Sequence, residues 1–226
     1  MDAIFTLTAF TPAEATAITG VSQDLQRDWR RRGFLPRSEG HARFDLFGLA
    51  ELLTMKLLSA RDIGPKAAAE VADWCGNGIA YHALDAVDAY EGDHLRTNEA
   101  RGLDDRPLSD DERSKLATLI SQTGGRYDAP DVRWGDKADW LRRQVYHKRT
   151  GTRVIPGSLF AWWADDSHSF LLSLDEALAD MLSGDPRLAG PIVVLDLQAL
   201  AYTLSERAGR AFVHVEFPNL PPIPGA

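Results

Sequence analysis

One segment near the N-terminus carries helix-start and helix-stop signals at a spacing that few folds accommodate. Thr11 followed by Pro12 is typical of an N-cap with proline at the first helical position. Gly20 readily adopts the left-handed conformation that closes a helix, and Ser22 then provides a second N-cap before Gly33 ends the next helix. The pattern therefore predicts two short helices joined by a tight turn. The predicted helices cover residues 12–18 and 23–32.

The second of these helices is basic, although the chain as a whole is acidic. Among 226 residues, 33 are Asp or Glu and 25 are Lys or Arg, which gives a net charge of -8. Arginines nevertheless gather around Trp29, and helical periodicity places the polar side chains on one face. Leu25 and Trp29 form an apolar edge that we expect to pack on the first helix. A capped basic helix after a short turn is typical of a recognition helix that enters the major groove of DNA.

We expect the DNA contacts to come from this helix and from the polar segment that follows it. Residues 37–43 contain Gly40 and predict a hairpin or wing. Gln23, Gln26, Arg27 and Arg30 are placed to reach base edges, while other cations reach phosphates. If about four to six cations contact phosphates, the affinity falls with salt by about -0.9 in log–log slope per contact. The candidate DNA-binding residues are Ser22, Gln23, Gln26, Arg27, Arg30, Arg31, Arg37, His41 and Arg43.

These residues resemble the winged helix-turn-helix of MerR-type transcription regulators. That family carries an alanine in its first helix, then Gly-Val-Ser, an arginine two residues before an aromatic, and a run close to Arg-x-Gly-Leu-Leu-Pro. The segment 40–45 resembles the end of the family's wing, and the likeness extends over about residues 8–75. The matching positions are Ala15, Gly20, Val21, Ser22, Arg27, Trp29, Arg31, Gly33, Leu35 and Pro36.

The resemblance implies a bacterial regulator that binds palindromic promoter DNA as a homodimer. The chain departs from the family at Gln26, where an apolar residue is usual, and at Asp28, where an aromatic is usual. Asp28 would repel phosphate unless Arg31 or Arg32 neutralises it. The wing arginine is displaced by one position to Arg43. The family's long dimerising helix and its sensor region are missing, so we expect no metal- or redox-sensing role.

The rest of the chain predicts further helices and then a change of period. Asp45 caps a third helix, a fourth covers 66–74, and the run 75–78 (Cys-Gly-Asn-Gly) is interpreted as a terminator and hinge. A helix is possible over 80–90, and 91–107 is interpreted as an exposed connection. Ser109 begins a capping-box pattern. The later predicted helices cover 110–122, 136–148, 174–182 and 197–208, and the predicted strands cover 158–164, 169–172, 191–196 and 211–217.

This order predicts an α+β fold: an N-terminal all-α winged helix-turn-helix followed by a mixed α/β domain with a small sheet. We expect three segments. Residues 1–76 form the DNA-binding domain, 77–156 a mainly helical connecting region, and 157–226 an α+β domain with a dimerising or regulatory role. The strands near the C-terminus are the candidate dimer surface, because an open sheet edge can pair. The prolines of the tail exclude it from a central strand position.

Composition excludes several other classes. Cys75 is the only cysteine, so an internal disulfide is excluded and thiolate metal sites are disfavoured. The N-terminus has no signal-peptide pattern, and no apolar run is long enough for a bilayer, so we expect a cytoplasmic protein. Since no phosphate-binding glycine loop or nucleophile elbow is present, we expect neither an enzyme nor a cofactor or metal. An effector ligand is unknown.

Several alternatives remain open at this stage. Asp165, Asp166 and His168 have the residue types of a catalytic or metal site, although a polar hairpin turn is the simpler interpretation. A second basic stretch over 142–153 could contact phosphates or form a wet helix face. Four tryptophans could line a small-molecule pocket or belong to the core. As a whole-protein alternative, the chain is a phage-type small terminase, excisionase or architectural subunit. The four tryptophans are Trp134, Trp140, Trp162 and Trp163.

Overall fold

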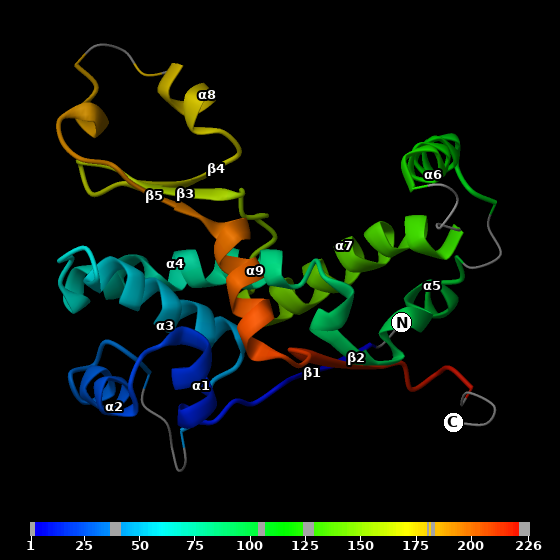
Figure 1. The fold of residues 1–226 in the computed structure, drawn as a ribbon, viewed down its shortest axis with the longest axis horizontal. Helices are drawn as coiled ribbons and strands as arrows, with labels where there is room; N and C mark the ends of the chain where they lie inside the picture. The colour runs from blue at the N-terminus through cyan, green and yellow to red at the C-terminus, as the bar shows by residue number, and fades with distance from the viewer. Residues whose placement is uncertain are drawn as a thin grey trace. The chain divides into compact units, whose positions relative to one another are not determined.

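The computed structural model describes residues 3–36, 42–103, 107–123, 129–179, 181 and 184–221. Within these residues the chain forms nine α-helices and two three-stranded sheets, an α+β fold (Figure 1). They divide into two units, each built from distant parts of the chain. Unit 1 contains the described residues of Met1–Leu7, Leu84–Gly151 and Ala211–Ala226, and unit 2 those of Thr8–Ala83 and Thr152–Arg210.

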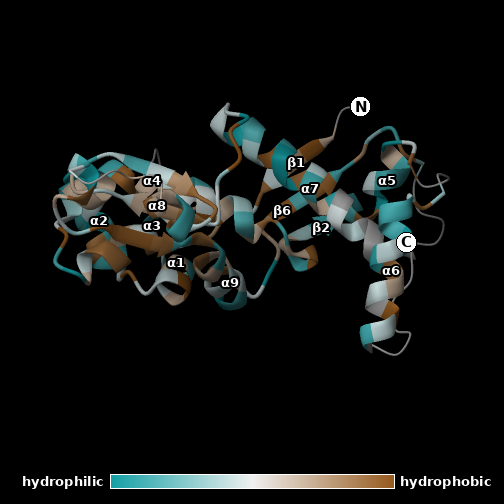
Figure 2. Cartoon of the chain, turned by 90° about the horizontal axis from the view of Figure 1, so that it is seen from above, coloured by the Kyte–Doolittle hydropathy of each residue, from teal (hydrophilic) through white to brown (hydrophobic). Residues whose placement is uncertain are grey.

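The first part of unit 2 consists of four helices whose predicted caps are confirmed. Thr11 forms a capping box with Glu14, Gly20 closes α1 at φ 72°, and Ser22 and Asp45 accept hydrogen bonds from the starts of α2 and α3. Helix α3 is buried on nearly every side, as expected of a central core helix, and it is largely brown in Figure 2. The helices are α1 (Pro12–Thr19), α2 (Gln23–Arg31), α3 (Leu46–Ser59) and α4 (Pro65–Ala83).

The predicted terminator and hinge at 75–78 is wrong, because α4 continues through it to Ala83. Its glycines serve close packing. A Cβ at Gly76 would lie 3.0 Å from the backbone nitrogen of Glu51 on α3, and one at Gly78 would lie 2.6 Å from Leu197 Cδ1. Glycine is destabilising inside a helix relative to alanine, and here the close approach of neighbouring elements explains its presence.

The second part of unit 2 is a small sheet followed by a helix. The predicted hairpin is confirmed: β3 and β4 pair antiparallel with Phe160 opposite Phe170, and β5 pairs with the other side of β3. Helix α9 follows β5 directly and runs past α4 and α3 to α1 (Figure 1). It buries a stripe of apolar side chains spaced i, i+4 and i+7. The elements are β3 (Leu159–Trp162), β4 (His168–Leu171), α8 (Leu174–Ala179), β5 (Val193–Asp196) and α9 (Leu197–Ala208), and the stripe is Leu197, Ala201 and Leu204.

Unit 1 is a three-stranded sheet with helices. Strand β6 is central: β1 pairs with it antiparallel and β2 pairs with it parallel. Helix α7 buries Ala138, Leu141 and Val145 at helical spacing, and the capping box of α6 between Ser109 and Glu112 is confirmed. The elements are β1 (Ile4–Leu7), β2 (Tyr90–Gly92), a 3₁₀ turn (Asp93–Arg96), α5 (Thr97–Ala100), α6 (Asp110–Thr123), α7 (Ala129–Thr150) and β6 (Val213–Glu216).

The structure therefore differs from the three consecutive segments expected from the sequence. The N-terminal strand β1 and the C-terminal strand β6 belong to one sheet, and that pairing carries no local sequence signal. The stretch 80–90 is only partly helical, and 91–107 contains a strand end, the 3₁₀ turn and α5 rather than an exposed connection. Since β6 is flanked on both sides, it offers no free edge for dimerisation; β4 and β5 are the edge strands of the other sheet. Among the described residues, no helix is long and apolar enough to cross a membrane.

Candidate nucleic-acid interface

The turn between α1 and α2 is tight and closely packed. The Gly20 N–H donates to Thr16 O at 2.8 Å, and Val21 is fully buried. Gly20 has a positive φ, and a Cβ there would lie 2.1 Å from Lys56 Nζ of α3. The positive φ favours glycine at the turn, whereas the end of the flexible Lys56 side chain could move aside.

Gln26 is buried rather than exposed, which corrects its prediction as a base-reading residue. Its side chain is 0% exposed, and Nε2 lies 3.1 Å from Pro12 O, 3.1 Å from Thr16 Oγ1 and 2.9 Å from Val21 O. The Gln26 amide and the Thr16 hydroxyl both donate to the carbonyls of Pro12 and Val21 on the two sides of the turn. Gln26 therefore fixes α2 against α1 and cannot reach a base edge.

The buried face of α2 consists of Gln26 and Trp29, and its opposite face is charged. Leu25 is 39% exposed, so its predicted packing on α1 is wrong. Gln26 takes the place expected for Leu25 because helical geometry puts position 26, next to 29, on the inner face. The remaining candidates on the exposed side are Ser22, Gln23, Arg27 and Arg31.

The exposed face of α2 alternates aspartates and arginines that pair with one another. Arg27 Nη1 lies 2.9 Å from Asp24 Oδ1, and Arg31 Nη2 lies 2.5 Å from Asp28 Oδ1. Arg32 lies 3.6 Å from the other oxygen of Asp28. As the sequence required, Asp28 is neutralised by neighbouring arginines. The side chains of Arg27 and Arg31 remain 71% and 80% exposed, so both can also reach an external anion.

Arg30 is half-buried and lies against the segment that follows α2. Its guanidinium carbon is 4.6 Å from the centre of the Phe44 ring, a cation–π contact. Burial lowers the pKa of Arg30, although an arginine stays protonated in proteins. Phe44 in turn forms an antiparallel bridge with Phe10, with N–O distances of 2.8 and 2.9 Å. Arg30 thus links α2 to this bridge.

The candidates on the predicted wing are only partly described. Arg37 and His41 lie outside the described residues, whereas Arg43 is exposed next to the bridge at Phe44. Leu35 is buried, and Phe34 N donates to Trp29 O at 2.8 Å, which closes the end of α2.

Sequence reasoning missed the contribution of α9. Arg207 Nη1 donates to Ile18 O at the C-terminal end of α1, at 3.3 Å. Arg210 pairs with Glu14 at 2.9 Å and its guanidinium lies 4.4 Å from the centre of the Phe10 ring. These arginines are separated from α1 by most of the chain, so no local pattern signals the contact.

The alternative catalytic cluster is a turn. Asp165 accepts hydrogen bonds from the N–H and the hydroxyl of Ser167, and Asp166 has a φ of 66°. The pKa of Asp165 is lowered, first by the Ser167 hydroxyl. The His168 ring packs against the rings of Trp74 and Phe160, tilted to both. In the described part of the chain, no three His, Cys, Asp or Glu side chains form a group that could hold a metal ion.

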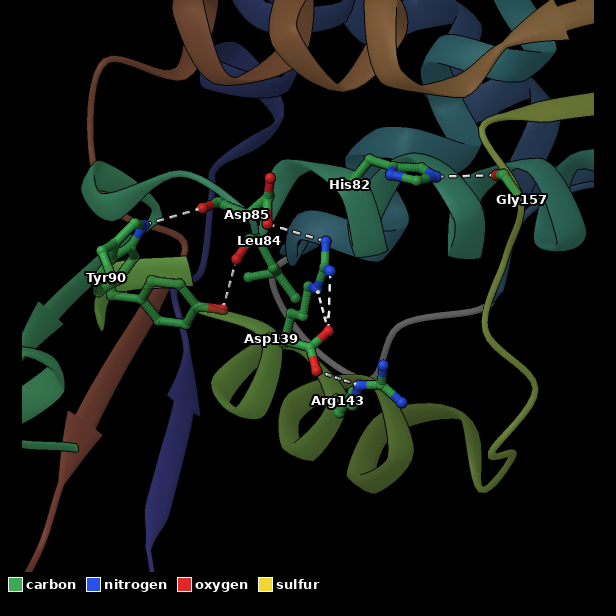
Figure 3. A network of polar contacts seen from close by, with 9 residues as sticks. His82, Leu84, Asp85, Tyr90, Asp139, Arg143 and Gly157 are labelled. Carbon is green, nitrogen blue, oxygen red and sulfur yellow. Dashed lines mark hydrogen bonds and ion pairs between the residues drawn. The ribbon is translucent and has the colours of Figure 1, made fainter. Parts of the chain in front are cut away.

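The second basic stretch lies partly on α7 and is internally paired there. Asp139 accepts from Arg143 Nε at 2.7 Å and from Arg142, which also bonds Asp85 at 2.9 Å (Figure 3).

The four tryptophans considered as a pocket lining are divided between the two units. Trp134 and Trp140 belong to unit 1, and Trp162 and Trp163 belong to unit 2.

Comparisons with protein-family models, with curated proteins and with solved structures found no match.

Proposed function

We propose that this chain is a sequence-specific DNA-binding regulator in which α1 and α2 form a MerR-like winged helix-turn-helix. In this proposal α2 lies in the major groove. Gln23 and Arg27 reach base edges from its N-terminal half, while Arg31 and Arg43 contact phosphates. The chain acts as a homodimer on two half-sites.

The observation that carries the proposal is the fixed orientation of α2. Buried Gln26 and Trp29 hold one face against α1, so the arginines necessarily lie on the other. The N-cap at Ser22 leaves the first N–H groups of α2 at an exposed end, where the helix dipole favours an anion such as phosphate.

The ion pairs on α2 do not prevent DNA binding. Exposed pairs between neighbouring helix positions contribute only about 0–1 kcal/mol. A phosphate can therefore compete with Asp28 for Arg31, and a base edge can compete with Asp24 for Arg27. The aspartates lower the net charge of the face, and we expect them to limit nonspecific binding rather than to support it.

The test is selection of bound sequences from random duplexes, followed by affinity measurements at several salt concentrations. The double variant R27Q/R31Q should lose affinity and sequence preference, and should reduce the log–log salt slope by about 0.9, since Arg31 is its one phosphate contact. The control R113Q/K115Q removes the same charge from exposed, acid-paired positions on α6. Equal effects of the two double variants would show that only net charge matters, and would refute the proposed helix.

A complementary variant should act in the opposite direction. Asp24→Asn frees Arg27 and should raise DNA affinity severalfold, whereas Asp110→Asn, which breaks a similar i,i+3 pair on α6, should leave it unchanged. The mass of the free protein in solution checks the expected dimer.

A further inference from the structure

The seam between α5 and α7 in unit 1 contains buried polar atoms without hydrogen-bond partners. These atoms are His94 Nδ1, both Asn98 amide atoms and Arg101 Nη1. His94 lies in the 3₁₀ turn, Asn98 in α5 and Arg101 directly after α5, so the three residues fall within eight positions of the chain. Buried polar groups are normally paired, and each exception is costly. Three exceptions within eight positions call for a partner that the described residues do not supply.

The facing side of the seam is aromatic and basic. The Trp134 ring meets the His94 ring edge-on at 6.1 Å between centres, and the Arg101 guanidinium lies 5.5 Å from the centre of Trp140. Lys137 on α7 donates from Nζ to Leu95 O at 2.9 Å. The seam thus has a tryptophan toward each end and two cations.

Three described acidic groups near the seam are engaged elsewhere. Asp93 and Glu99 both pair with Arg96, and Asp139 pairs with arginines on its own helix. Because these acids are engaged, the charges of Arg101 and Lys137 are not balanced by an acid among the described residues of the seam. The pKa of His94 is lowered by burial and by the charge of Lys137, and backbone hydrogen bonds at Gly92 and Glu91 oppose this.

We infer that this seam binds a small organic carboxylate carried on a flat apolar ring. Arg101 and the Asn98 amide donate to the carboxylate, the charge-assisted pairing that these groups make most strongly. Trp134 and Trp140 contact the ring. Asn98 is 1% exposed, whereas His94 and Arg101 are half-buried, so the Asn98 amide lies deepest in the proposed site. The ligand enters when the side chains of His94 and Arg101 move apart. None of these residues belongs to the proposed DNA interface.

The test uses thermal unfolding of the full chain with three probes. Benzoate should raise the Tm in proportion to the logarithm of its concentration once binding saturates. Benzamide has the same shape without the charge, and inorganic phosphate has charge without the ring, so both should have little effect. Asn98→Leu keeps the volume, and without ligand it should unfold at the same or a higher temperature than the wild type because a buried unpartnered amide has been removed. It should lower the apparent affinity for benzoate about tenfold or more, as expected for a lost hydrogen bond to a charged group.

The site is located by the indole N–H signals of a ¹H–¹⁵N NMR spectrum. Benzoate should shift the signals of Trp134 and Trp140, which are identified by single substitutions to Phe. The control Gln144→Leu, at an exposed position of α7, should bind benzoate as the wild type does. The inference is overturned if benzoate does not stabilise the wild type, if Asn98→Leu retains full benzoate binding, or if phosphate stabilises as strongly as benzoate.

Discussion

Replacing Gln26 should destabilise the fold rather than alter DNA sequence preference. In the structure its amide nitrogen lies within 3.1 Å of three acceptors, the carbonyls of Pro12 and Val21 and the Thr16 hydroxyl. Its two protons make two good hydrogen bonds at a time. Gln26→Ala removes these bonds, leaves the Thr16 hydroxyl as the side-chain donor shared by the two carbonyls, and opens a cavity.

The magnitude follows from these losses. Two lost hydrogen bonds at about 0.5–1.5 kcal/mol each cost about 1–3 kcal/mol together, and the lost side-chain volume adds to it. The unpartnered Gln26 Oε1 is removed at the same time, which offsets part of the cost. We expect the free energy of unfolding to fall by about 2–4 kcal/mol, a large share of the roughly 5–15 kcal/mol typical of a domain. For a chain of this size the Tm would fall by roughly 4–16 °C.

Urea denaturation of three variants separates the contributions. Gln26→Met keeps the volume and isolates the hydrogen bonds, so it should be destabilising but less so than Gln26→Ala. Gln23→Ala, at an exposed position of the same helix, should stay within about 0.5 kcal/mol of the wild type. If Gln26→Ala unfolds like the wild type while its selected DNA sequence changes, Gln26 is a base-reading residue and the burial argument fails.

Three further outcomes are expected. Gly78→Val should lower the free energy of unfolding by about 2–3 kcal/mol, because the new side chain overpacks against Leu197. Urea denaturation measures this, with Asn77→Ala as a control that should unfold like the wild type. The pKa of Asp139 is lowered because hydrogen bonds from its arginines outweigh burial, so Asp139→Asn should cost stability at neutral pH and progressively less as the pH falls below the ordinary value of 3.8. A fragment of residues 1–76 should lack a cooperative thermal transition, because it cuts α4 and lacks α9; a sharp transition would contradict this.

Features set by hydrogen bonds within a few residues were predictable from the sequence. The caps at Thr11, Ser22, Asp45 and Ser109 all bond a residue three positions later, and each was placed correctly. The hairpin between β3 and β4 followed in the same way from a short polar turn between apolar runs.

Features set by distant contacts were not predictable. Gly76 and Gly78 have the local signal of a helix end, yet they lie inside α4 because Glu51 and Leu197 approach them closely. Gln26 is polar by composition but buried, since its acceptors are produced by the turn itself. In each case the tertiary environment overrode a correct local preference.

The position of the basic helix depends on the far end of the chain. Both ends of α1 are held by α9 and the residues directly after it. Arg207 of α9 bonds a carbonyl at the C-terminal end of α1, where a cation also interacts well with the helix dipole, and Arg210, just beyond α9, pairs with Glu14 in the first turn of α1. Helix α1 in turn holds α2 through Gln26. These contacts join positions 189 and 196 residues apart, so the orientation of the charged face is a property of the whole of unit 2 rather than of the N-terminal segment that carries the arginines.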